Sequence, residues 1–72
     1  MIVCTLERIL TQRGLSQREL ARLSGVHRAT IARLCNDNWE KVDRYVLTAL
    51  CECLHVKPQR LFTWQEADDE ED

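Results

Sequence analysis

The chain has few of the residues and segments that are typical of membrane, secreted or loop-rich proteins. Its 72 residues include one proline, two glycines, two tryptophans, one tyrosine and one phenylalanine. No apolar run approaches the roughly 20 residues that a membrane-spanning helix needs. Residues 1–4 lack the charged start, apolar middle and small-residue cleavage site of a secretion signal. We therefore expect a soluble protein of the cytoplasm.

The sequence also lacks the patterns of a metal or catalytic site. Its cysteines are Cys4, Cys35, Cys51 and Cys53, and no two of them form a C-x-x-C pair. On a helix, Cys51 and Cys53 would lie about 200 degrees apart and could not hold one ion together. Free cysteines in a cytoplasmic chain are usually small buried hydrophobes. His27 and His55 show no spacing to a carboxylate and a nucleophile that suggests catalysis. We expect no metal, no cofactor and no enzymatic activity.

Charge is divided unequally along the chain. The net charge of −2 includes six acidic residues and no basic residue within 66–72, so the other 65 residues carry ten bases against six acids, a net +4. A chain of this length forms a single domain. We expect that domain to span residues 1–65 and to be followed by an acidic tail at 66–72 that is disordered and aids solubility. Two other roles of the tail stay open: it could occupy the basic face of the domain, or it could recruit a protein partner.

Residues 15–34 predict two short helices joined by a glycine turn. Ser16 and Glu19 have the S-x-x-E spacing of a capping box, which predicts a helix that begins near Gln17. Gly25 favours a tight turn after that helix. In the second helix Ile31 and Leu34 share the inward face, because residues three apart lie on the same side. This arrangement is typical of a helix-turn-helix.

The rest of the chain predicts further helices and no strand. Apolar residues at helical spacing indicate a first helix over about residues 3–13, which Gly14 ends. The polar segment 36–38 indicates a loop, and Asp43 is placed to cap a fourth helix. Pro58 suits the first turn of a short fifth helix. We expect an all-α fold, a compact bundle of about five short helices.

Seven residues in the helix-turn-helix region resemble the Cro/C1-type helix-turn-helix of phage repressors and XRE-family regulators. They are Gln17, Leu20, Ala21, Gly25, Val26, Ile31 and Leu34. The resemblance extends from about Val3 to Trp64 and implies a lambda-repressor-like DNA-binding domain. Cys35 and Asp37 replace the glutamate and glycine common in the family, and His55 stands where relatives often carry glycine. The geometry of the loop after the third helix is therefore open, and the fourth helix is expected to end less cleanly.

The resemblance places the third helix in the major groove of DNA and the second helix across the phosphate backbone. The residues expected to read bases are His27, Arg28, Ala29, Thr30, Ala32 and Arg33, with Arg33 the first choice. Arginine can donate two hydrogen bonds to guanine, and small methyl groups permit close approach. In the family the residue at Gln17 contacts phosphate. The residues expected to hold phosphates are Gln17, Arg13, Arg18, Asn36, Asn38, Lys41 and Arg44.

One such domain would read only one short half-site, so we expect a homodimer, as in related domains. The expected dimer contacts are Leu61, Phe62 and Trp64, although the aromatic residues could instead close the core. The whole pattern predicts a sequence-specific transcriptional regulator, a repressor that occupies an operator in double-stranded DNA. The alternative is a protein-interaction module, an antitoxin or adaptor, that uses the same fold with the acidic tail as a contact.

Overall fold

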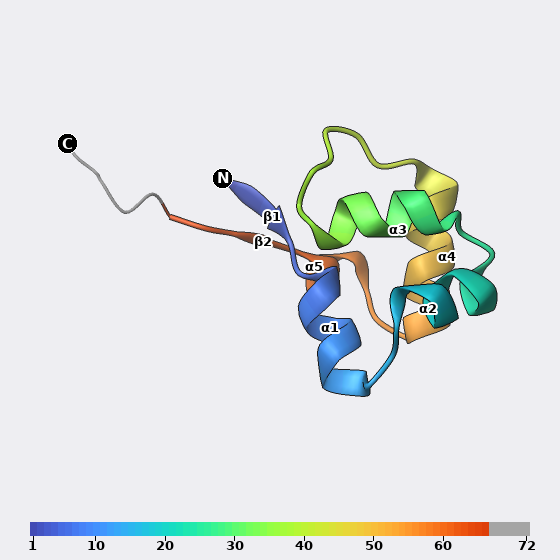
Figure 1. Cartoon of the computed structure of the whole chain (residues 1–72). Coiled ribbons are helices and arrows are strands. Elements are labelled where there is room, and N and C mark those ends of the chain that lie inside the picture. The colour runs from blue at the N-terminus through green and yellow to red at the C-terminus, as the bar shows by residue number, and fades with distance from the viewer. Residues whose placement is uncertain (67–72) are drawn as a thin grey trace.

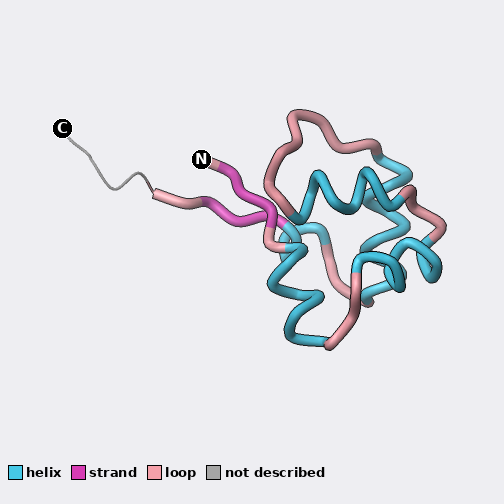
Figure 2. Tube along the Cα trace, in the orientation of Figure 1, coloured by secondary structure: helices cyan, strands magenta, loops and turns pink. Residues whose placement is uncertain are grey.

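Within residues 1–66, which the structure describes, five short helices and two three-residue strands follow one another along the chain (Figure 1). The structure is a computed structural model. Its elements are β1 (Ile2–Cys4), α1 (Leu6–Arg13), α2 (Gln17–Ser24), α3 (Arg28–Cys35), α4 (Arg44–Leu54), α5 (Pro58–Leu61) and β2 (Phe62–Trp64). The helices pack around one core, whereas the strands form a ribbon that leaves the bundle on the side of the amino terminus (Figure 2). The predicted helical bundle is confirmed.

The ribbon corrects the expectation that the chain has no strand and that its first helix begins at residue 3. β1 and β2 pair antiparallel, with Ile2 opposite Trp64 and Cys4 opposite Phe62. Because residues 2–4 belong to this ribbon, α1 begins only at Leu6. Three-residue strands offer too few positions for an alternating pattern to stand out. Their partners also lie at opposite ends of the chain, so no hairpin turn signals the pairing.

The helix-turn-helix predicted over residues 15–34 is confirmed, together with its cap and its turn. The amide of Glu19 donates to the Ser16 hydroxyl and the amide of Ser16 donates to the Glu19 carboxylate, each at 3.0 Å. These bonds satisfy amides that the start of α2 would otherwise leave unpaired. Gly25 ends the helix at a φ of 77°, in the left-handed region that glycine enters without steric cost. Three residues later α3 begins at Arg28.

The core is formed by side chains from α1 to α5 and from the turn between α2 and α3. Its members are Leu6, Ile9, Leu10, Leu20, Val26, Ile31, Leu34, Leu50, Leu54 and Leu61. α2 packs against both α3 and α4, and α1 packs against α3. Full burial of one such aliphatic side chain stabilises the fold by roughly 1.5–3 kcal/mol. This packing fixes the orientation of α3, whose opposite face carries exposed side chains.

The fourth helix starts where the sequence predicts and ends in a left-handed residue. The Asp43 carboxylate accepts a hydrogen bond from the amide of Tyr45 at 2.6 Å and so caps α4. After Leu54, His55 takes a φ of 57°, and its amide donates to the carbonyl of Cys51. His55 therefore adopts the backbone conformation that glycine would take at this position, and α4 ends there despite the substitution.

Candidate nucleic-acid interface

Helix α3 divides cleanly into a buried face and an outward face. Ile31 and Leu34 are buried in the core, as the sequence predicts. The residues expected to read bases lie on the other side: His27, Arg28, Ala29 and Arg33 are exposed, and Thr30 and Ala32 are half-buried at its margins. A helix with its side chains is about 10–12 Å wide, which fits the major groove of B-DNA at about 12 Å. The face therefore has both the size and the hydrogen-bond donors that groove reading needs.

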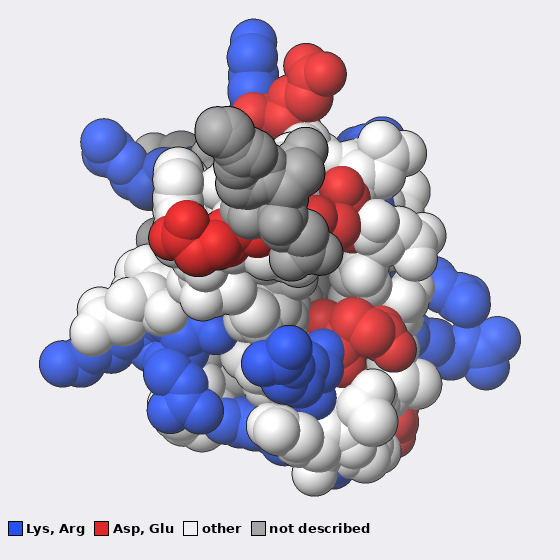
Figure 3. All heavy atoms as spheres, turned by 90° about the vertical axis from the view of Figure 1, so that its left-hand side faces the viewer, with Lys and Arg blue, Asp and Glu red and all other residues white. Residues whose placement is uncertain are grey.

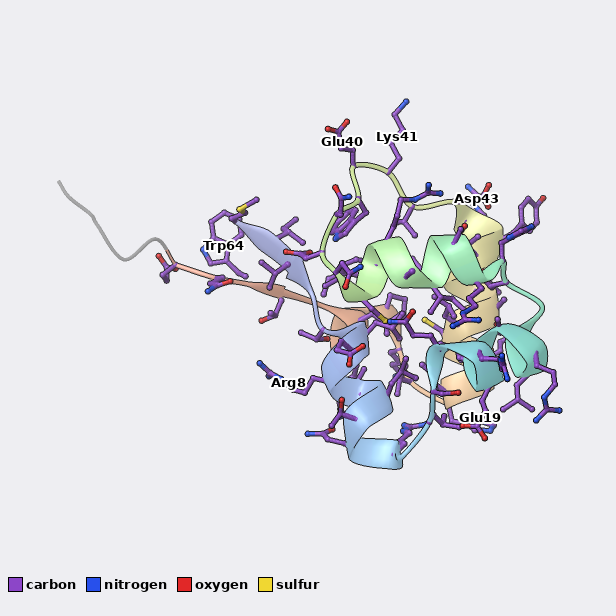
Figure 4. The ribbon with its side chains drawn as sticks, viewed as in Figure 1. Arg8, Glu19, Glu40, Lys41, Asp43 and Trp64 are labelled. Atoms are coloured by element: carbon purple, nitrogen blue, oxygen red, sulfur yellow. The ribbon has the colours of Figure 1, made fainter. Side chains whose placement is uncertain are left out.

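The loop from residue 36 to residue 43 passes over α3 and continues the outward surface (Figure 1). It and the start of α4 carry the exposed residues expected to hold phosphates on this side, which are Asn36, Asn38, Lys41 and Arg44. The side chains of Lys41 and Glu40 project away from the bundle at the top of the loop (Figure 4). Four of the seven expected phosphate contacts thus lie in the segment that directly follows α3.

Asp37 fixes the conformation of this loop, and the sequence reading did not assign it a role. Its backbone is left-handed, with a φ of 56°. Its Oδ1 accepts a hydrogen bond from the amide of Cys4 at 3.0 Å and another from the indole Nε1 of Trp39 at 2.7 Å. The Trp39 ring in turn packs against Phe62 of β2, with the ring centroids 5.1 Å apart. Asp37 thereby ties the loop beside α3 to both strands of the ribbon. The only sequence signal was an aspartate where the family prefers glycine.

A cleft of about 540 Å³ lies between α3, this loop and the start of α4. It is lined by Thr30, Arg33, Leu34, Trp39, Lys41, Val42, Asp43 and Val46. Its walls combine an apolar floor with the cations of Arg33 and Lys41. Because Arg33 belongs to both the cleft and the outward face of α3, the cleft is part of the same candidate interface.

The predicted phosphate contacts before α3 lie in more restricted positions. Gln17 occupies the first turn of α2, half-buried, and its side chain lies beside the thiol of Cys35. The guanidinium of Arg13 donates to the carbonyl of Leu54, so it closes the end of α4. Arg18 is exposed on α2. Of these three, only Arg18 is exposed and makes no contact with another side chain or carbonyl like those of Gln17 and Arg13 within residues 1–66. The phosphate role of all three stays a prediction.

Cys4, Cys35 and Cys51 sit in environments that raise the pKa of their thiols. Burial raises the pKa of the Cys35 thiol to about 12, and the neighbouring Glu7 carboxylate adds to the increase. Burial likewise raises the pKa of Cys4 and of Cys51. All four cysteines are free thiols.

Across residues 1–66 no cluster of three or more His, Cys, Asp or Glu could hold a metal ion. In the same range, every helix is too short or too polar to cross a membrane.

The three residues expected to form a dimer contact do not lie on one surface. Leu61 is only 1% exposed and belongs to the core, which corrects its assignment as a contact with a second copy. Leu61 faces inward because α5 is a single helical turn that packs against β2. Phe62 is half-buried against Trp39. Trp64 remains 65% exposed at the outer part of the ribbon (Figure 4).

The face from which the ribbon projects carries a different charge pattern. Figure 3 views the molecule from this side: acidic side chains lie near its middle and top, and Lys and Arg side chains lie over much of its lower part as well as at its margins. The ribbon side therefore carries charges of both signs.

Comparison with known families supports this geometry. The family described as a Cro/C1-type helix-turn-helix DNA-binding domain matches residues 5–67, so the chain belongs to that family. The members of this family are DNA-binding domains. Among solved structures, the chain is similar to one titled "Crystal structure of a putative DNA-binding protein from Bacteroides fragilis". The two are 25% identical with a TM-score of 0.72, over 88% of this chain and all of the other. No curated protein matches the chain.

Proposed function

We propose that this protein is a sequence-specific transcriptional regulator that represses by occupying its operator in the cytoplasm, without catalysing a reaction. The observation that carries the proposal is the division of α3. One face is buried in the core, and the other exposes two arginines, a histidine and small side chains. Such a face would pack poorly against protein, but it suits the hydrogen-bond acceptors and methyl groups of the major groove.

In this proposal, Arg33 has the central role in reading sequence. It lies on the outward side of α3 one residue before the buried Leu34, and it also lines the cleft beside the loop. A planar guanidinium there can donate two hydrogen bonds to O6 and N7 of a guanine. Arg28 and His27, at the start of α3, would reach bases on the other side of the half-site. Ala29 lets the helix backbone come close to the groove floor.

Phosphate binding would come from the segment that follows α3. Asn36, Asn38 and Lys41 are exposed on the loop, and Arg44 is exposed at the start of α4. These side chains would fix the register of the helix on the duplex without reading sequence. Because Asp37 holds the loop, the geometry of these contacts would depend on its two hydrogen bonds.

The proposal is tested by comparing Arg33→Ala with Arg8→Ala. Arg8 is an exposed arginine on α1 that points away from α3 (Figure 4), so its removal changes net charge by the same amount at a distant place. Wild-type protein first selects duplexes from a random library, and fluorescence anisotropy then measures affinity for a selected duplex and for its scrambled form over a range of salt concentrations. We expect Arg33→Ala to lose about 1–3 kcal/mol on the selected duplex and much less on the scrambled one.

For Arg8→Ala we expect nearly unchanged affinity on both duplexes. Equal losses for the two variants on both duplexes would show that arginine contributes only general charge and would contradict base reading by α3. If no duplex binds at low salt, even after removal of residues 66–72, then DNA binding by this chain is wrong. The protein-interaction alternative, an antitoxin or adaptor, would then take its place.

A further inference from the structure

The cleft beside α3 has a size that the proposed contacts with DNA do not explain. Its volume of about 540 Å³ falls within the range of small-molecule sites, about 300–1,000 Å³. Residues of α3, of the loop that follows it and of the start of α4 form its walls. Base reading uses the outward face of α3, and phosphate binding uses exposed side chains of the loop and of α4. Neither role requires a hollow between these elements.

The floor and one wall of the cleft are apolar and held in place. The apolar residues are Leu34, Val42, Val46 and Trp39. The indole Nε1 of Trp39 already donates to the Asp37 carboxylate at 2.7 Å, and the ring packs against Phe62 with the centroids 5.1 Å apart. The polar edge of this ring is therefore occupied, so what it adds to the cleft is apolar surface. A wall that is ordered before a ligand binds lowers the cost of binding.

The polar groups of the cleft favour an anion. Thr30 and Arg33 are three residues apart on α3, so their side chains are neighbours on the helix surface. No hydrogen bond within residues 1–66 involves the Thr30 hydroxyl. Lys41 adds a second cation at the rim, where its side chain projects from the loop (Figure 4). Among residues 1–66, Asp43 is the one acidic residue that lines the cleft, and its carboxylate is engaged at 2.6 Å as the cap of α4.

We propose that this cleft binds an aromatic carboxylate as a small-molecule effector. The flat ring of the ligand would lie against Trp39 and the two valines, and its burial would remove apolar surface from water. The carboxylate would accept paired hydrogen bonds from the Arg33 guanidinium and one from the Thr30 hydroxyl. An apolar cavity with a few convergent polar groups is the usual construction of a small-molecule site.

The consequence for DNA follows from the double role of Arg33. A guanidinium that holds a carboxylate is not available to O6 and N7 of a guanine. The bound anion also adds negative charge beside the loop that would contact phosphates. The ligand would therefore release the protein from its operator. This release rests on the proposed function, whereas binding of the ligand to the cleft does not.

Nuclear magnetic resonance of the isotope-labelled full chain without DNA tests the site. The probe is indoleacetate, which joins a flat apolar ring to a carboxylate. We expect it to shift the indole resonance of Trp39, with a dissociation constant of about 1 mM or tighter. The indole of Trp64, on the ribbon, is the internal control and should not shift. Indoleacetamide lacks the charge and acetate lacks the ring, so each should bind roughly 5-fold more weakly or worse.

Two variants separate the charge of the cleft from its space. Arg33→Gln keeps a hydrogen-bond donor and loses the cation, so it should bind indoleacetate no more tightly than indoleacetamide. Val46→Phe fills part of the cleft and should weaken binding of indoleacetate. The control is Arg8→Gln, which removes an arginine of α1 that does not line the cleft and should bind as wild type does. Helical circular dichroism reports whether each variant is folded.

Fluorescence anisotropy on the selected duplex, at constant ionic strength, tests the release. Indoleacetate at about ten times its own dissociation constant should raise the apparent dissociation constant of the duplex about 10-fold, and acetate should not. The proposal is overturned if indoleacetate leaves Trp39 unshifted at about 10 mM, if acid and amide bind wild type equally, or if the saturated protein keeps its affinity for the duplex. If no duplex binds at all, the proposed function fails, and the resonance titration still decides whether the cleft is a site.

Discussion

At the scale of single residues, Asp37 and His55 share an uncommon backbone conformation for different reasons. Both have a positive φ, 56° and 57°, in the region where a side chain costs about 1–2 kcal/mol. Asp37 offsets this cost, because its carboxylate accepts the amide of Cys4 and the indole of Trp39. No hydrogen bond within residues 1–66 involves the imidazole of His55, and its side chain is exposed. The two positions should therefore respond oppositely to glycine.

We predict that His55→Gly stabilises the fold by up to about 1 kcal/mol, since glycine removes the left-handed strain at the end of α4. Asp37→Gly should instead destabilise it by about 2 kcal/mol, because the loss of two charge-assisted hydrogen bonds outweighs the same relief. Urea unfolding followed by circular dichroism measures both. Asp37→Asn is the matched control, because asparagine tolerates this conformation and keeps an acceptor oxygen. Stabilisation by both glycine variants would show that the Asp37 contacts contribute nothing.

At the scale of elements, the start of α2 includes a carboxylate whose ionised form is favoured by the fold. The Ser16 amide donates to the Glu19 carboxylate and holds the pKa of Glu19 below its usual range, with the Ser16 hydroxyl as the second cause. A carboxyl group whose pKa is lower in the folded state contributes stability above its unfolded-state pKa. That contribution is lost as the pH falls through the folded-state pKa. The capping box is thus an acid-sensitive element.

We predict that wild-type stability falls more steeply than that of Glu19→Gln as the pH is lowered from neutral to about pH 3. Glutamine keeps an acceptor for the Ser16 amide but does not titrate. Thermal melts at a series of pH values would show the two proteins converging at the acid end. Parallel melting curves over the whole range would mean that ionisation of Glu19 has no effect on folding. Glu52→Gln on α4 is the control for removal of a negative charge elsewhere.

The predictability of each element follows from how local its signals are. The capping box, Gly25 and the spacing of Ile31 and Leu34 lie within one short segment, and the sequence predicted the helix-turn-helix from them. The ribbon depends on pairing between the two ends of the chain, which no local pattern reports. For the same reason Leu61 was assigned to a surface, since a single turn of helix does not show which side the ribbon covers. The role of Asp37 was missed because the groups that donate to its carboxylate are the amide of Cys4 in β1 and the indole of Trp39.

At the scale of the whole molecule, the charges separate by position. Six of the twelve acidic residues lie within residues 66–72, and without them the net charge changes from −2 to +4. The exposed cations Arg28, Arg33 and Lys41 belong to α3 and the loop after it, whereas Glu66, which follows the ribbon, accepts a hydrogen bond from the Trp64 indole at 3.0 Å. Residues 67–72 lie outside the described part of the chain. The molecule therefore has basic side chains on α3 and the loop after it, and an excess of negative charge at its carboxyl end.

We predict that removal of residues 66–72 tightens binding to random-sequence duplex, and that the gain is greatest at low salt. Six fewer negative charges reduce repulsion of the phosphate backbone, and salt screens that repulsion. Fluorescence anisotropy over a salt series measures the effect. The control is a tail of the same length with each acid changed to its amide, which separates charge from chain length and should match the truncation. If both variants bind as wild type does, the tail does not act on the DNA surface, and its acidic residues serve solubility or a protein partner.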